Sequence, residues 1–190
     1  MRQQSGTAYC EAHGVGSVAI ANGENSSAVV NGDHNTARVS GDGSTAEVED
    51  GSANKVTVRG DNSYASVIRG DANTLTVTGD DSFAGVLAGN ANTLTVDGTN
   101  SQAGVGNGHS NIVSVDGDNS FAAAGYGNEN VATVVGDNSA AGASEGMQNT
   151  ATVTADGSGA YAGEGNGNTA VATTDGCIAE AFGIGSNDFC

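Results

Sequence analysis

Residues suited to a protein core alternate with polar residues in short runs along the chain. The same five residues, Asn-Thr-Leu-Thr-Val, occupy positions 73–77 and 92–96, and their apolar members stand two positions apart. This spacing is the period of a β-strand with one buried face. A glycine followed by Asp or Asn precedes many of these runs and predicts a turn. The chain is therefore predicted to be all-β, with short strands separated by glycine-containing turns.

The runs recur every 19 residues, and each repeat divides into a half of nine residues and a half of ten. The fourth position of the nine-residue half is Asn in every repeat from Asn35 to Asn187. The same position of the ten-residue half is Ser from Ser44 to Ser158, and then Cys177. Small or apolar residues fill the columns two and four positions later. A register kept this strictly indicates stacked structural repeats.

Each repeat is predicted to form one coil of two strands, and each strand to pair in parallel with its copies in the adjacent coils. The fold class is thus a two-sheet parallel β-solenoid of about nine 19-residue coils over residues 14–183. At a strand spacing of about 4.8 Å the rod would be about 43 Å long. Residues 1–13 and 184–190 depart from the pattern, and we expect them to cap the exposed sheet edges at the two ends. The inward Asn columns are expected to form hydrogen-bonded ladders between coils.

Charge narrows the range of partners. The chain has 22 acidic and 5 basic side chains, a formal net charge of -17, and no Lys or Arg after residue 69. Nucleic acid is therefore not an expected partner. No apolar run is long enough to span a membrane, and the first six residues lack the apolar core of a signal peptide. We expect a protein of a virion or of the extracellular space or cell surface, with no signal peptide in this chain.

The three cysteines fall at the two ends of the predicted rod. Cys177 and Cys190 both lie near the C-terminus and are predicted to form a disulfide that clamps that end. Cys10 lies at the other end, too far away to join them. It is expected to be either a buried free thiol or a link to another chain. Together with three scattered His residues, the cysteines do not form a zinc-binding pattern.

The outward positions of the ten-residue halves predict an apolar strip that small residues keep flat. Exposed aromatic and branched side chains of this kind are typical of protein contacts. The simplest partner is a second copy of the chain, in a dimer or a trimer. The predicted interface residues are Tyr64, Ile68, Phe83, Leu87, Phe121 and Tyr161.

Residues 16–20 (Gly-Ser-Val-Ala-Ile) and the recurring Asn-Ser-x-Ala pattern resemble the head repeats of trimeric autotransporter adhesins, although the alternation of nine and ten residues differs from those shorter coils. Similar β-rolls occur in phage fibres. The resemblance implies a non-enzymatic structural or adhesive rod, either a tail fibre or a surface adhesin-like component. Its partners would be further copies and other virion or cell-surface components. No cluster of catalytic side chains is evident, so we expect no enzymatic activity.

The outward positions of the nine-residue halves form an array of Thr-x-Thr pairs. Here the chain resembles hyperactive β-solenoid antifreeze proteins, whose ranked threonines order water, so ice binding is the alternative function. Exposed Thr is also simply favourable in strands, and Arg38, Lys55, Arg59, Asp97 and Asp116 are expected on the same side. The candidate ice-binding residues are Thr57, Thr74, Thr76, Thr93, Thr95, Thr133, Thr150 and Thr152.

A column of carboxylates follows the glycine of the ten-residue half. One interpretation is Ca²⁺ bound between coils, as in the RTX β-roll, although the Gly-Gly-x-Gly-x-Asp signature of that fold is absent. This gives a second alternative function, a Ca²⁺-stabilised secreted or surface-layer module. The other interpretation is that each Asp caps its own turn and requires no cofactor. The candidate Ca²⁺ ligands are Asp42, Asp61, Asp80, Asp118 and Asp137.

Overall fold

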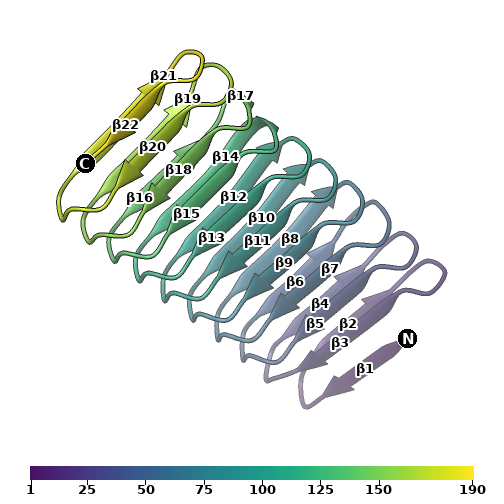
Figure 1. Ribbon diagram of the computed structural model, residues 1–190. Helices are drawn as coiled ribbons and strands as arrows, with labels where there is room; N and C mark the ends of the chain where they lie inside the picture. The colour runs from purple at the N-terminus through teal and green to yellow at the C-terminus, as the bar shows by residue number, and fades with distance from the viewer.

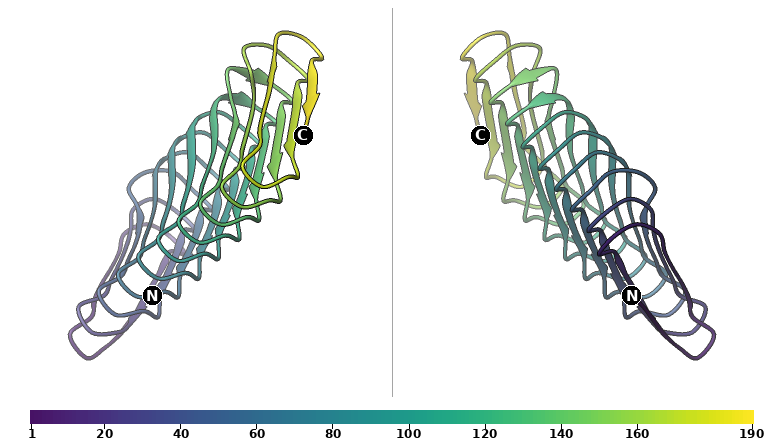
Figure 2. Two further views of the ribbon diagram at one scale, coloured as in Figure 1. Left: turned by 90° about the vertical axis from the view of Figure 1, so that its left-hand side faces the viewer. Right: turned by 90° about the vertical axis from the view of Figure 1, so that its right-hand side faces the viewer.

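The computed structural model describes residues 1–190, apart from the side chain of Gln4. It is an all-β rod of two parallel sheets, and the predicted two-sheet β-solenoid is confirmed. The coils are stacked along one axis, with the N-terminus and the C-terminus at opposite ends (Figure 1). Side views show the same long, narrow stack (Figure 2).

Sheet A contains the strands of the nine-residue halves in the order β1-β3-β5-β7-β9-β11-β13-β15-β18-β20-β22. Their bounds are β1 (Arg2–Ser5), β3 (Val18–Asn22), β5 (Thr36–Val39), β7 (Lys55–Val58), β9 (Thr74–Val77), β11 (Thr93–Val96), β13 (Ile112–Val115), β15 (Val131–Val134), β18 (Thr150–Val153), β20 (Thr169–Ala172) and β22 (Asn187–Phe189).

Sheet B contains the strands of the ten-residue halves in the order β2-β4-β6-β8-β10-β12-β14-β16-β19-β21. Their bounds are β2 (Tyr9–Ala12), β4 (Ser27–Val30), β6 (Thr45–Val48), β8 (Tyr64–Arg69), β10 (Phe83–Ala88), β12 (Gln102–Asn107), β14 (Phe121–Asn128), β16 (Ala140–Ala143), β19 (Gly159–Gly163) and β21 (Ile178–Phe182). The short strand β17 (Gly146–Met147) pairs with the end of β14.

The register repeats the sequence period. Thr74 pairs with Thr93, and Phe83 pairs with Gln102, each 19 positions further along the chain. Strands also form within both segments that were expected to cap the rod: β1 pairs with β3, β2 pairs with β4, and β22 pairs with β20. The stack therefore has about ten turns rather than nine.

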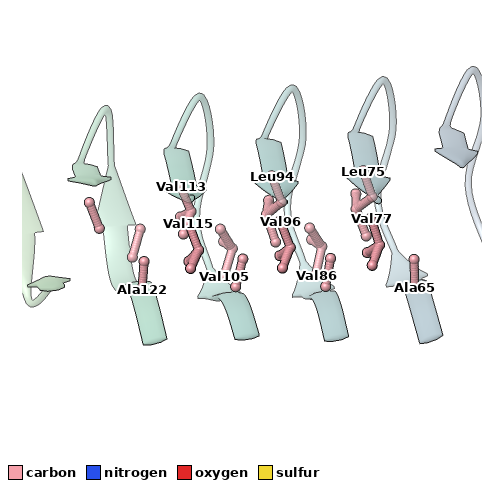
Figure 3. Packing of buried hydrophobic residues seen from close by; sticks show 14 of the residues in the cluster. Ala65, Leu75, Val77, Val86, Leu94, Val96, Val105, Val113, Val115 and Ala122 are labelled. Carbon is pink, nitrogen blue, oxygen red and sulfur yellow. The ribbon is translucent and has the colours of Figure 1, made fainter. Parts of the chain in front are cut away.

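The core is a single thin layer between the two sheets. Leu75, Leu94 and Val96 of sheet A are fully buried and face Val86 and its neighbours of sheet B (Figure 3). Each buried Val or Leu side chain contributes about 1.5–3 kcal/mol. Because Ala, Val and Leu fill nearly the whole layer, the sheets lie close together, and larger side chains are left on the outer faces.

Buried Asn residues connect the coils at the turns, as their column predicted, and buried Ser residues do the same in the other half-repeat. The Asn54 backbone N–H donates to Oδ1 of Asn35 at 2.8 Å, and its side-chain amide donates to the Gly70 carbonyl at 2.6 Å. In the other column the Ser63 N–H donates to Oγ of Ser44 at 2.9 Å. Polar groups hidden from water thus find partners in the coils on either side.

The turns use the left-handed backbone conformation at one position of each half-repeat. Asn62 and Asn100 adopt φ values of 52° and 54°, as suits Asn. Ala72 and Ala91 adopt φ of 57° at the equivalent position of the other half. Alanine is unfavourable in this conformation, because its Cβ approaches the backbone.

Candidate binding surfaces

The outer face of sheet B is hollowed over β8, β10, β12 and β14. The hollow is open to solvent and has a volume of about 320 Å³. Its lining residues are Ser66, Ile68, Phe83, Gly85, Val86, Leu87, Gly104, Val105, Gly106, Ala123, Ala124 and Gly125. None of them is charged, so the hollow is an apolar surface on a strongly acidic protein.

A change of side-chain size along the repeat columns produces this shape. The column of Ile68 and Leu87 continues with Gly106 and Gly125, so a wall of branched side chains gives way to bare backbone. In the adjacent column, a Cβ added to Gly104 would meet no atom within 4 Å, which places Gly104 on the open floor. A Cβ added to Gly85 would lie 2.6 Å from Cζ of Phe83, so this ring covers Gly85.

Phe83 is held from one side by Tyr64. The two rings stack with centroids 5.7 Å apart and an angle of 12° between their planes. The hydroxyl of Tyr64 donates to Oε2 of Glu47 at 2.9 Å. Burial raises the pKa of Tyr64, a hydrogen bond with Ser66 lowers it, and the hydrogen bond to Glu47 raises it again. The stack fixes the Phe83 ring beside the hollow.

The predicted interface residues do not form one continuous strip. Ile68, Phe83 and Leu87 line the hollow, with Phe83 38% and Leu87 43% exposed. Tyr64 is only half-buried at its edge, and Phe121 is exposed two strands from Phe83, outside the lining. Tyr161 lies further along the rod.

The ring of Tyr161 covers two glycines, Gly142 on the adjacent strand and Gly159 on its own strand. A Cβ added to Gly142 or Gly159 would lie 3.1 Å from this ring. Other exposed apolar side chains, Tyr126 and Met147, were not predicted. They lie where β14 runs past the usual strand end and pairs with β17, so the regular column pattern gave no signal for them.

The Thr-x-Thr array is present on sheet A but is interrupted. Thr74 pairs with Thr93 and Thr76 with Thr95, which aligns two ranks on β9 and β11. A second group lies on β15 and β18, where Thr133 pairs with Thr152 and Val131 with Thr150. Ile112 and Ser114 of β13 separate the two groups. Thr57 is only 7% exposed, so its side chain is largely closed to surface water.

The carboxylates of the acidic column accept hydrogen bonds between coils. The backbone N–H of Asp42 donates to Oδ1 of Asp61 at 2.8 Å, and that of Asp61 donates to Oδ1 of Asp80 at 2.8 Å. Asp42, Asp118 and Asp137 accept in the same way from Glu24, Thr99 and Asp118. Each of these Asp side chains thus binds the preceding coil, whereas the turn-capping interpretation expected bonds within its own turn. Among the residues that the structure describes, no three His, Cys, Asp or Glu side chains gather as metal ligands would.

The cysteines occupy the two ends of the rod. Cys177 and Cys190 form a disulfide with Cα atoms 6.2 Å apart, which ties the end of β22 to the last coil of sheet B. Cys10 is a buried free thiol whose Sγ donates to the Gln3 carbonyl at 3.0 Å. Of the two states expected for Cys10, the structure shows the buried free thiol.

Comparisons with known proteins give no relative from which a function could be transferred. The chain matches no protein-family model, and a comparison with curated proteins finds no match. In the described part of the chain, no helix has the length and apolar character needed to cross a membrane.

Proposed function

We propose that the chain is a non-enzymatic structural rod that binds a second copy of itself through the apolar hollow on sheet B, as part of a fibre or an adhesive surface structure. The observation that carries this proposal is the hollow itself, in which Phe83 and Leu87 stand exposed beside the open floor at Gly104. A virion or cell surface would be its setting.

Burial of apolar surface supplies the driving force. Each Å² removed from water contributes about 25 cal/mol, and the ring of Phe83 and the branched chain of Leu87 offer the largest areas. Because no lining residue is charged, burying the hollow leaves no unpaired charge in the contact. The glycine floor allows another surface to approach the backbone closely.

The charge of the molecule opposes this contact from a distance. Two copies each carrying a net charge of -17 repel one another, and salt screens that repulsion over about 8 Å at physiological ionic strength. Self-association through the hollow should therefore strengthen as salt is raised. A contact based on ion pairs would weaken instead.

The test compares Phe83→Glu and Leu87→Glu with Ile112→Glu. Ile112 is 50% exposed on sheet A, so its replacement adds the same charge on the opposite face. We expect light scattering to give an oligomer for the unaltered chain and for Ile112→Glu, and 18.4 kDa monomers for the two hollow variants. An unchanged molar mass in both hollow variants would reject this interface.

Ice binding is a second candidate, because the ranks Thr74–Thr93 and Thr76–Thr95 are in register on neighbouring strands. An ice-binding face should lose thermal hysteresis when Thr76→Leu and Thr95→Leu are combined, and keep it when Thr45 of sheet B is changed to Leu. An absence of thermal hysteresis in the unaltered protein, or no loss in the double variant, would reject this function.

A further inference from the structure

We propose that the outer face of sheet A carries a binding site for a small oxyanion, of the phosphate or sulfate type, formed by Arg38, Lys55 and Arg59. The three cations line one hollow of about 580 Å³. The rest of its lining is His34, Thr36, Ala53, Asn54, Thr57 and Thr76, which includes hydroxyl donors and no carboxylate.

The register brings the three cations around one residue. Arg38 on β5 pairs with Thr57 on β7. Lys55 and Arg59 precede and follow Thr57 by two positions, so their side chains leave the same face of the sheet. Neighbouring strands are about 4.8 Å apart and alternate residues of a strand about 6.6 Å apart, distances that an oxyanion can bridge. Thr57 is 7% exposed at the centre of this group.

Within the part of the chain that the structure describes, the three cations have no partner. Among the described residues the only ion pair joins His13 and Glu11, and the side chains of Arg38, Lys55 and Arg59 form no hydrogen bonds. Along the Arg59 column the next carboxylate, Asp97, is two coils away and accepts a hydrogen bond from Thr78. Three like charges kept together and unpaired repel one another, and a bound anion would offset that repulsion.

A second hollow lies beside the first. It has a volume of about 210 Å³, and Arg38, Thr57 and Arg59 line both. Arg38 and Arg59 therefore border open space in two adjoining hollows. Arginine presents its N–H donors in a planar fork that fits the oxygens of phosphate or sulfate, and lysine adds a point charge.

The charge of the whole protein restricts the ligand to a small one. The molecule has 22 acidic side chains, and a long polyanion such as nucleic acid would pass close to many of them. A small anion in the hollow interacts mainly with the three cations, because salt screens its repulsion by carboxylates more than about 8 Å away. This site is independent of the proposed self-association, which uses the other sheet.

The repeat itself supplies variants that should preserve the fold. Lys55→Thr reproduces Thr36 and Thr74 of its column, Arg38→Thr reproduces Thr57, and Arg59→Thr reproduces Thr78. Arg69→Ala is the matched control, because it removes one cation from sheet B and reproduces Ala88 of its column. Thermal unfolding verifies that each variant is folded.

Isothermal titration calorimetry with inorganic phosphate, sulfate and glycerol phosphate, at constant ionic strength, tests the site. We expect saturable binding to the unaltered chain and to Arg69→Ala, and a loss of about tenfold in affinity for each single Thr variant, the effect of removing one charge-assisted hydrogen bond. The triple variant should not bind. Tighter binding of glycerol phosphate than of phosphate would identify a phosphate ester as the ligand, and equal binding would identify the free ion.

Two results would overturn the proposal: no binding of any of the three anions to the unaltered chain, or equal binding by the triple variant. Because Arg38, Lys55 and Arg59 belong to the sheet A side of the rod, their Thr variants should leave the oligomeric state unchanged. The outcome for the anion site is thus separate from the outcome for self-association.

Discussion

The side-chain amide of Asn92 donates a hydrogen bond to Oδ1 of Asn73, one coil earlier, at 3.0 Å. The Asn92 backbone N–H donates to the same oxygen, and its side-chain amide also reaches the Gly108 carbonyl at 2.9 Å. One buried side chain thus connects three successive coils. The Asn column holds the stack together from inside the turn, where no water is available to replace a missing partner.

We expect Asn92→Ala to lower the free energy of unfolding by about 3–5 kcal/mol, because it leaves several buried polar groups without partners. These include the Gly108 carbonyl and the Asn111 N–H, which donates to Oδ1 of Asn92. Urea-induced unfolding followed by circular dichroism measures the change. Asn107→Ala is the control: Asn107 is exposed and pairs with Ala88, so a change within about 0.5 kcal/mol is expected. Equal effects at both positions would contradict the role of the ladder.

Replacing Ala91 by Gly should stabilise the protein. Ala91 has a φ of 57°, and removing its Cβ relieves the backbone strain by more than the added flexibility of the unfolded chain costs. We expect the free energy of unfolding to rise by about 1 kcal/mol. The same change at Ala123, which lies in strand β14, should lower it by a similar amount. A loss of stability at both sites would show that the turn is not strained.

The acidic column gives a prediction that separates hydrogen bonding from charge. Asp80 accepts the N–H of Asp61 at 2.8 Å. Asp80→Asn keeps an acceptor and removes one of the repelling charges, so we expect stability to be maintained or raised. Asp80→Ala removes the acceptor and should cost about 1 kcal/mol.

The same column predicts the response to Ca²⁺. Because these carboxylates already accept backbone N–H groups, we expect a chelator to leave the melting temperature unchanged. A fall of several degrees, reversed by added Ca²⁺, would instead show that the cation joins the coils.

Tyr64 should ionise above the ordinary tyrosine pKa of about 10. Burial raises the pKa of Tyr64, and Glu47 adds to the effect. Since the folded-state pKa lies above the unfolded value, this group stabilises the fold fully below about pH 10, and that contribution is lost as pH rises through the folded-state pKa. The difference in tyrosinate absorbance between the unaltered chain and Tyr64→Phe gives the midpoint. A midpoint at or below 10 would contradict this environment.

The fold can be predicted well from the sequence because the same residue types recur at the same position of successive repeats. Asn35 to Asn187 mark one turn in each successive coil after the first, and the apolar columns mark the buried face. The number of coils was underestimated, because the coils at each end are shorter and their residues differ from the pattern. Strands β1 and β22 pair through the backbone, which requires no particular side chain.

The surfaces were harder to predict. The pattern identified Ile68, Phe83 and Leu87 as exposed, but it did not show that Gly104 and Gly106 form a floor between them, because a hollow depends on side-chain size across four strands. The hollow lined by Arg38, Lys55 and Arg59 was not predicted either. The repeat columns already place Arg38 and Lys55 on one side of the rod, but the hollow that they line with Arg59 is seen only in the structure.

Sedimentation equilibrium of the unaltered chain and of Gly104→Glu tests most directly whether copies join through the hollow. A side chain at position 104 enters open space, so the fold should tolerate the change while a charge occupies the floor. We predict an oligomer of the unaltered chain that dissociates on dilution and strengthens with salt, and an 18.4 kDa monomer for Gly104→Glu. A monomer of 18.4 kDa at every concentration of the unaltered chain, or the same oligomer in both, would contradict the account.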